Sequence, residues 1–188
     1  MAVVDETKSL EEIRKFLADL VESILGLPQN KVLLQYRAEG QPMPKFGENI
    51  VFVNVQPELD ERDIYKVREE KYNTENDNFE YAQKSQRTLL AQFVLYGDKS
   101  SEYAKLLNES IYLPNYEYML NNFGLYLVPD RTIGPNYIPE LVNGRWWSRA
   151  DLQIRFYNPV SVKTTVKRLK DITITVETEG GQIEYITE

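Results

Sequence analysis

The chain has 188 residues and a formal net charge of −7, and it contains neither cysteine nor histidine. The two missing residue types exclude disulfide bonds, thiol nucleophiles, zinc–thiolate sites and catalytic triads that depend on histidine. Catalysis would have to rest on carboxylates, lysine, tyrosine or a bound magnesium ion. Because duplex DNA is itself strongly negative, the net charge also argues against simple electrostatic wrapping of nucleic acid.

The composition is typical of a globular, soluble protein. The N-terminal segment carries Asp5 and Glu6 and lacks the apolar stretch of a signal peptide. No run of residues reaches the ~18 apolar positions that a membrane span requires. We expect one domain over residues 1–188, because a chain of this length buries roughly 70% of its unfolded surface without a metal or a disulfide.

A helix is predicted first. Apolar residues recur at three- and four-residue spacing and form one apolar stripe. Ser9 and Glu12 match a capping box, and Gly26 suits the left-handed position that often follows a helix. The pattern predicts a helix over about Ser9–Leu25 whose apolar stripe faces the core.

Two apolar runs follow and predict strands over Lys31–Tyr36 and Ile50–Gln56. The second run is apolar on both faces, which is typical of a strand in the interior of a sheet. The prolines of the segment 41–44 indicate a loop between the two strands.

The next segment is strongly charged and then becomes apolar. Turn-forming residues occupy positions 73–78. We predict an extended β-hairpin over 63–96, with arms at Asp63–Tyr72 and Phe79–Tyr96, whose second arm enters the core. The alternative is a mobile acidic loop, because loops also collect charged and turn-forming residues.

Two shorter helices are predicted after this hairpin. Ser100 or Ser101 can cap the first of them, and Pro114 ends it. Asn115 can cap the second, and Gly124 closes it.

The last third of the chain is predicted to be β structure. A short strand over 125–128 and a proline-containing loop over 129–144 lead into it. From Ala150 onward, apolar and polar residues alternate, which indicates a half-buried strand. A C-terminal hairpin is predicted over 172–186.

Two neighbouring tryptophans precede the alternating strand. If that strand begins at Arg145, even positions face the core and odd positions face outward. We therefore predict that Trp146 is a core residue, and that Trp147, Arg145 and Arg149 contact a neighbouring subunit or partner protein, because tryptophan and arginine are enriched at binding hot spots. Two alternatives stay open: the preceding loop buries Trp147 within the same chain, or a one-residue bulge exchanges the two faces.

An acidic cluster lies in the predicted hairpin region. A magnesium site is one interpretation of it, but interleaved basic residues are more typical of a solvated or subunit-facing surface. The cluster comprises Asp60, Glu61, Asp63, Glu69 and Glu70.

A basic stretch near the C-terminus complements this cluster. Contact with DNA phosphates is one interpretation. We predict instead that it pairs with the acidic hairpin of a neighbouring copy or with an acidic partner. Pairing between copies would be a head-to-tail contact of the kind that closes rings. Its residues are Lys163, Lys167, Arg168 and Lys170.

Three stretches occur in a particular order and spacing. They are Gln41-Pro42-Met43-Pro44 followed by Ile50–Gln56, then Leu90–Asp98 leading into a helix, and finally Pro139-Glu140-Leu141-Val142-Asn143-Gly144-Arg145-Trp146-Trp147-Ser148-Arg149-Ala150-Asp151-Leu152. Together they resemble the neck terminator, or tail terminator, proteins of tailed bacteriophages. The last run is the most specific, and the resemblance covers about Leu10–Tyr157.

The resemblance implies an α+β fold: a mixed, mostly antiparallel sheet with about three helices packed mainly on one face, plus extended β-hairpins. It implies a structural protein and not an enzyme, with no catalytic, cofactor-binding or metal-binding residues. Such subunits form a ring, usually of six copies, at the head-proximal end of the tail. The ring terminates tail-tube assembly and joins the tail to the head connector.

Partners and location follow from the same resemblance. The implied partners are further copies of the chain, the tail tube protein, the sheath protein of a contractile tail, and the connector or stopper protein of the head. DNA would pass through the lumen without specific binding, and the protein would reach the virion after assembly in the host cytoplasm. The alternatives are another neck component, such as a connector stopper or tail-completion protein, and, less favoured, a small magnesium-dependent enzyme or a sugar-binding module.

Overall fold

The computed structural model describes residues 3–5, 7–35, 45–60, 63, 65–75, 77–129, 134–167, 172–178 and 181–187. The chain forms two compact units. The larger unit comprises Thr7–Lys66 and Ser85–Val160, and the smaller comprises Met1–Glu6, Val67–Lys84 and Ser161–Glu188. The single domain over 1–188 stays a prediction.

The described residues form three α-helices, one short 3-10 helix and twelve strands, which confirms the predicted α+β class. The helices are α1 (Leu10–Leu25), η1 (Gln29–Lys31), α2 (Ser100–Ser110) and α3 (Pro114–Phe123). The strands are β1 (Val3–Asp5), β2 (Val32–Leu34), β3 (Ile50–Glu58), β4 (Lys66–Asn73), β5 (Asn78–Tyr96), β6 (Tyr126–Leu127), β7 (Asn136–Tyr137), β8 (Glu140–Val142), β9 (Arg145–Trp147), β10 (Arg149–Lys167), β11 (Ile172–Thr178) and β12 (Gly181–Thr187).

The main sheet has the strand order β1-β10-β5-β3-β2. Strands β2 and β3 are parallel, whereas β3 pairs with β5 in antiparallel fashion, with Val53 opposite Phe93. Strands β6 and β7 pair with β10, and β4 pairs with β5. The interior position predicted for 50–56 is therefore confirmed, because β3 lies between β2 and β5.

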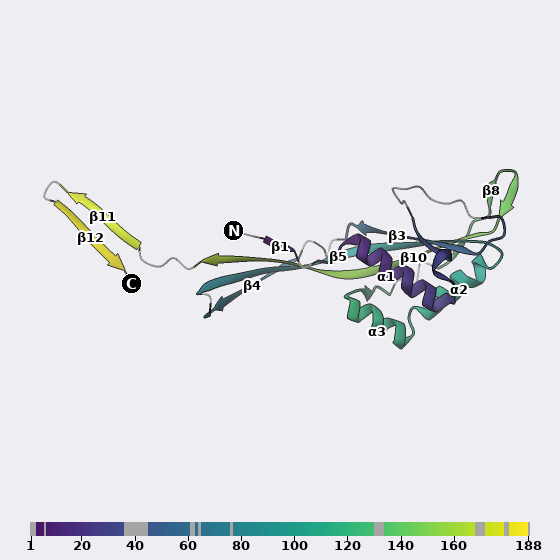
Figure 1. The fold of residues 1–188 in the computed structure, drawn as a ribbon, viewed down its shortest axis with the longest axis horizontal. Helices are drawn as coiled ribbons and strands as arrows, with labels where there is room; N and C mark the ends of the chain where they lie inside the picture. The colour runs from purple at the N-terminus through teal and green to yellow at the C-terminus, as the bar shows by residue number, and fades with distance from the viewer. Residues whose placement is uncertain are drawn as a thin grey trace. The chain divides into compact units, whose positions relative to one another are not determined.

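All three helices of the larger unit cover one face of this sheet (Figure 1). Alternate residues of β3 and β5 point at the helices, so Val53 and Phe93 join the apolar stripe of α1 in one core. Ile13 and Leu17 of that stripe are completely buried. On the opposite face, Phe52 belongs to a second, smaller cluster.

The predicted boundaries of α1 are confirmed in detail. The Ser9 hydroxyl accepts a hydrogen bond from the Glu12 amide, and the Glu12 carboxylate accepts one from the Ser9 amide in return. Gly26 follows the helix with a φ of 63°, in the left-handed region. Two orphan amides and the helix C-terminus are thus satisfied by local sequence alone.

The N-caps predicted for the next two helices are wrong, whereas Gly124 closes α3 as predicted, with a left-handed φ of 88°. Lys99 precedes α2 without a side-chain cap, and Ser100 is the buried first residue of the helix. Pro114 begins α3 instead of only ending α2, which places Asn115 inside the first helical turn. A proline at the first helical position loses no hydrogen bond, because the amide there has no partner within the helix.

Both predicted hairpins are confirmed. Strands β4 and β5 form the first, and in the smaller unit the rings of Tyr72, Phe79 and Tyr81 follow one another along it, with centroids 5.1 Å and 6.4 Å apart. Strands β11 and β12 form the second in antiparallel register.

Two segments differ from their predicted structure. The predicted loop over 129–144 contains strands β7 and β8, while its residues 130–133 lie outside the described part. Strand β10 continues past Pro159 to Lys167, so the basic stretch begins on a strand. The β-branched residues of 160–166 favour this extension, because their side chains fit a pleated surface.

Candidate assembly surfaces

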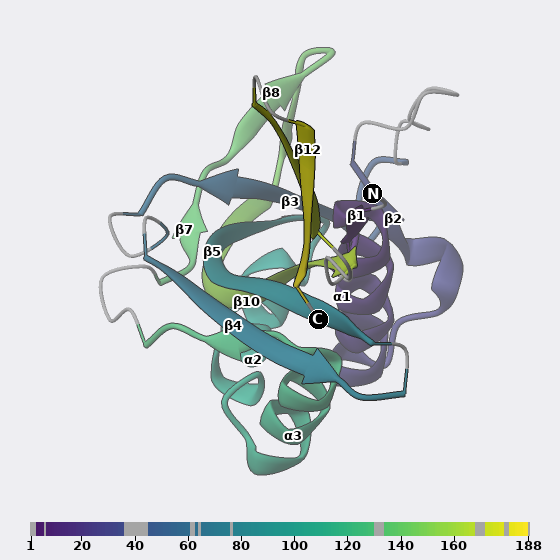
Figure 2. The ribbon, with the colours of Figure 1, turned by 90° about the vertical axis from the view of Figure 1, so that its left-hand side faces the viewer.

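A short hairpin of β8 and β9 carries the tryptophans and arginines that the sequence singles out. Its turn is Asn143-Gly144, and both residues have positive φ angles, 50° and 74°. This pair of angles is what a tight two-residue hairpin turn requires. Within the larger unit, the hairpin points away from α2 and α3 (Figure 2).

One face of this hairpin packs on the larger unit through Trp147. The Trp147 ring lies edge-on to Tyr96, at 6.1 Å and 87°, and edge-on to Phe46, at 5.7 Å and 81°. Trp147 is half-buried as a result. Glu140 lies directly opposite Trp147 in the strand register, so it belongs to the same inner face.

A hydrogen-bonded network closes that inner face. The Arg149 guanidinium donates from Nε and Nη2 to the two carboxylate oxygens of Asp151, at 2.7 and 2.8 Å. Its Nη1 donates to Glu140 Oε2 at 3.1 Å, and the Tyr96 hydroxyl donates to the same oxygen at 2.8 Å. Arg149 therefore ties the hairpin to β10 inside one chain, a role that the sequence did not reveal.

The network shifts the proton affinity of its members. Desolvation, followed by the hydrogen bond to Glu140, raises the pKa of Tyr96 to about 12. The hydrogen bond from Tyr96 and then the one from Arg149 lower the pKa of Glu140. The paired hydrogen bonds to Asp151 raise the pKa of Arg149 above its usual value. All three shifts keep the phenol protonated, the carboxylate ionised and the guanidinium charged near neutral pH.

The Tyr96 shift predicts an alkaline loss of stability. A raised folded pKa contributes stability below the unfolded value of about 10, and this contribution is lost as the pH rises toward 12. We expect Tyr96→Phe to make the free energy of unfolding less dependent on pH above 10, as measured by urea denaturation on both sides of that value. Tyr118→Phe is the control, because Tyr118 is exposed. Identical pH profiles for wild type and Tyr96→Phe would contradict the assignment.

The prediction that Trp146 is a core residue is wrong: its side chain is 67% exposed. The alternation from Ala150 onward is confirmed, with Leu152 and Phe156 buried. It does not extend back to the tryptophans, because Ser148 separates β9 from β10 and its carbonyl accepts a hydrogen bond from the Gly97 amide. One residue outside the strand is enough to exchange the two faces.

Alanine substitutions should separate the two tryptophans. We expect Trp147→Ala to lower the free energy of unfolding by about 1–3 kcal/mol, because it removes the edge-on contacts of the indole ring with Tyr96 and Phe46 and loosens the hairpin. Trp146→Ala should change it by less than about 0.5 kcal/mol, since the side chain is mostly in water. Chemical denaturation of both variants checks this order. A larger loss for Trp146→Ala would show that the hairpin packs the other way round.

The predicted acidic residues do not act as one group. Asp63 accepts hydrogen bonds from both the amide and the hydroxyl of Thr88 within the larger unit. In the smaller unit Glu69 pairs with Lys84 at 2.6 Å, and Glu70 accepts a hydrogen bond from Tyr81. Asp60 also has a partner, and Glu61 lies outside the described residues.

The predicted basic residues are described only in part. Lys163 lies on β10, where it lines a small cavity of about 370 Å³ within the smaller unit. It already has an interaction partner within the chain. Lys167 is the last residue of β10, while Arg168 and Lys170 lie outside the described residues. The pairing of acidic and basic segments between copies stays a prediction. Asp63, Glu69 and Glu70 already have partners within the chain, so fewer carboxylates of the cluster are available for it than the sequence indicates.

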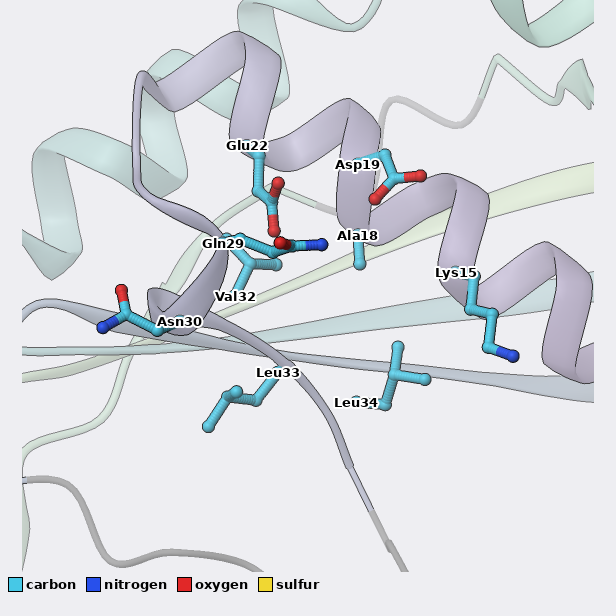
Figure 3. A pocket seen from close by; sticks show the side chains of 9 residues that line it. All are labelled: Lys15, Ala18, Asp19, Glu22, Gln29, Asn30, Val32, Leu33 and Leu34. Atoms are coloured by element: carbon cyan, nitrogen blue, oxygen red, sulfur yellow. The ribbon is translucent and has the colours of Figure 1, made fainter.

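A second feature of the larger unit is a groove between α1 and β2, with a volume of about 1000 Å³ (Figure 3). Ala18 from the helix and Val32, Leu33 and Leu34 from the strand form its apolar lining. Strand β2 is the last strand on this side of the sheet in the described part of the chain. The sequence predicted a helix and a strand over these residues, but no groove between them.

Within the described ranges, no three carboxylates converge in a way that could hold a metal ion. The described helices include none long and apolar enough to cross a membrane.

The exposed hairpin, with its tryptophan and arginine side chains, has the chemistry of a protein-binding surface. A family model described as Phage neck terminator protein matches residues 11–181. The chain therefore belongs to the phage neck terminator family, and the resemblance seen in the sequence is confirmed. Its class is a structural protein of the virion neck. No curated protein matches the chain.

Proposed function

We propose that this protein is the subunit of a homo-oligomeric ring, usually of six copies, at the head-proximal end of a phage tail. The ring terminates tail-tube assembly and provides the surface on which the head connector docks. The observation that carries this proposal is the match of residues 11–181 to the neck terminator family.

The described surface supports a role in assembly. Trp146, Leu141 and Arg145 are exposed on a hairpin whose other face is fixed to the larger unit, so a protein partner meets a rigid surface. Rigid aromatic side chains lose little conformational entropy on binding. The proposed partners are further copies of the chain, the tail tube protein, the sheath protein of a contractile tail, and the connector or stopper protein.

Tail tubes that lack the terminator give the direct test. We expect added protein to stop tube elongation and to appear as a cap at one end in electron micrographs. Tubes that keep growing at the normal rate, with no cap, would rule out termination. Binding to connector-bearing heads without binding to tubes would favour the connector-stopper alternative instead.

The lumen of the ring should not bind DNA tightly. Each copy has a net charge of −7, so the assembled ring as a whole carries negative charge that repels phosphate. We expect no measurable binding to free duplex DNA at physiological salt, with fluorescence anisotropy as the measurement. Tight binding that weakens steeply with added salt would contradict this expectation.

A further inference from the structure

The outer face of the β8–β9 hairpin is an apolar knob, which we define as Leu141 and Trp146. The two residues lie directly opposite each other in the strand register. Leu141 is 57% exposed and Trp146 is 67% exposed. A cross-strand pair of this kind presents one continuous apolar surface. Tryptophan in particular is the residue type most enriched where protein partners bind tightly.

The knob is held in one orientation before any partner arrives. On the opposite face of the same hairpin, Trp147 packs edge-on against Tyr96 and Phe46. Glu140 accepts hydrogen bonds from Tyr96 and Arg149 on that face. Since the hairpin is already ordered, docking the knob costs little further loss of conformational freedom.

The α1–β2 groove has the complementary chemistry. Its lining is apolar near Ala18, Val32 and Leu34, and the carboxylates of Asp19 and Glu22 stand on its helix side (Figure 3). The groove volume of about 1000 Å³ is ample for an indole ring. No residue of the chain's own β8–β9 hairpin lines this groove.

The rim of the groove carries two negative charges, on Asp19 and Glu22, that positive groups of the same chain compensate only in part. Burial and the nearby charge of Asp19 raise the pKa of Glu22. Lys15, the lysine of the groove lining, forms an ion pair with Glu11 at 2.7 Å. A cation brought to this rim would be attracted by both carboxylates.

The hairpin carries such a cation next to the knob in sequence. Arg145 directly precedes Trp146 and is exposed, but its guanidinium lies on the inner side of the hairpin, 5.4 Å from the centre of the Phe46 ring. Docking therefore requires this long side chain to leave Phe46 and reach the rim of the groove. The apolar surface of the knob matches the apolar lining, and its arginine matches the acidic rim. Both features belong to the same compact unit, so every copy of the chain presents one of each.

We propose that the knob of one copy docks in the α1–β2 groove of a second copy, with Arg145 facing Asp19 and Glu22. Knob and groove are different surfaces, so after the first contact one copy still has a free groove and the other still has a free knob. Contacts of this head-to-tail kind continue from copy to copy and close into a ring when the rotation fits. The inference rests on the proposed function and names the contact that would build its ring.

Complementary variants test the contact. We expect Trp146→Ala in the knob and Glu22→Arg in the groove each to weaken self-association at least about tenfold, as loss of a hot-spot residue does. Light scattering and sedimentation over a range of concentrations, with and without tail tubes, measure it. Tyr118→Ala is the matched control, because Tyr118 is also 67% exposed, on α3. Association that is unchanged in both test variants would overturn the proposal.

Mixing the two variants gives a sharper result. The Glu22→Arg chain keeps an intact knob and the Trp146→Ala chain keeps an intact groove, so their mixture should form a dimer and nothing larger. A contact between identical surfaces would not produce this complementation. A mixture that stays monomeric under conditions in which wild type associates would overturn the head-to-tail contact.

The absence of cysteine allows a direct geometric test. In a chain carrying Arg145→Cys and Glu22→Cys, mild oxidation should link copies into a ladder on a denaturing gel. The control pair of Arg145→Cys with Glu102→Cys, which lies on α2, should not form it. A ladder of equal strength in the control would overturn the proposed geometry.

The same variants, measured for association, tube capping and cross-linking, separate this inference from the proposed function. If wild type caps tubes and Trp146→Ala caps them equally well with normal association, only the knob contact is wrong. If Trp146→Ala loses capping while the copies still associate normally, the knob binds a tail protein instead, which overturns the self-contact. If the chain with Arg145→Cys and Glu22→Cys forms the ladder but wild type never joins tubes, the contact stands and the proposed function fails.

Discussion

Phe93→Ala should lower the free energy of unfolding by about 3–5 kcal/mol. Phe93 lies in the C-terminal part of β5, opposite Val53 of β3, and its side chain is 1% exposed in the core beneath the helices. Its removal leaves a cavity that the surrounding strands and helices fill only in part. Domains of this kind are stable by about 5–15 kcal/mol, so the loss is a large share of the total.

Urea denaturation of the purified variant measures this effect. Phe46→Ala is the matched control, because it deletes the same ring from a side chain that is more than half exposed. We expect its cost to stay below about 1.5 kcal/mol, the value of an aromatic contact such as the one with Trp147. Equal losses for Phe93→Ala and Phe46→Ala would mean that β5 is not central to the core.

Gly97→Ala should lower the free energy of unfolding by about 2–5 kcal/mol, through backbone strain and overpacking together. Gly97 has a φ of 105°, where side chains are strained. A Cβ there would lie 2.6 Å from the Glu48 carbonyl oxygen and 2.8 Å from the Asn49 Cα atom. These are backbone atoms, so the junction between β5 and α2 must move to admit a methyl group.

Gly26→Ala is the control for the conformational part of this effect. Gly26 also has a positive φ, 63°, but a Cβ added there meets no atom within 4 Å. Its cost should therefore be only the left-handed penalty, about 1–2 kcal/mol. Thermal denaturation compares the two variants, and a Gly26→Ala loss as large as that of Gly97→Ala would refute the steric explanation.

The elements that the sequence predicts well are those governed by local patterns. Helix α1 has its apolar stripe, its Ser9–Glu12 capping box and Gly26, all within 18 residues of chain, and each is found where expected. The apolar run of β3 and the alternation of β10 from Ala150 onward likewise contain their own orientation, because side chains alternate strictly along a strand.

The failures at Trp146 and Arg149 involve contacts between distant parts of the chain. Whether Trp146 or Trp147 faces inward depends on Ser148, whose carbonyl bonds to Gly97 fifty-one residues earlier. The role of Arg149 depends on Glu140 and Tyr96, which the fold brings together. Neither contact leaves a trace in the spacing of apolar residues. The prediction that Trp146 lies in the core is therefore wrong, and the internal role of Arg149 is visible only in the fold.

The position of β10 in the sheet has a consequence for synthesis on the ribosome. This strand lies between β5 and β1, and it is made after all three helices. At about 5–20 residues per second, β5 waits several seconds with an unpaired, partly apolar edge before β10 emerges. Strand β1 waits far longer, because Val3 pairs with Thr164 at the other end of the chain. Exposed strand edges invite pairing with other chains, so nascent copies should depend on chaperones most strongly just before residues 149–167 leave the exit tunnel.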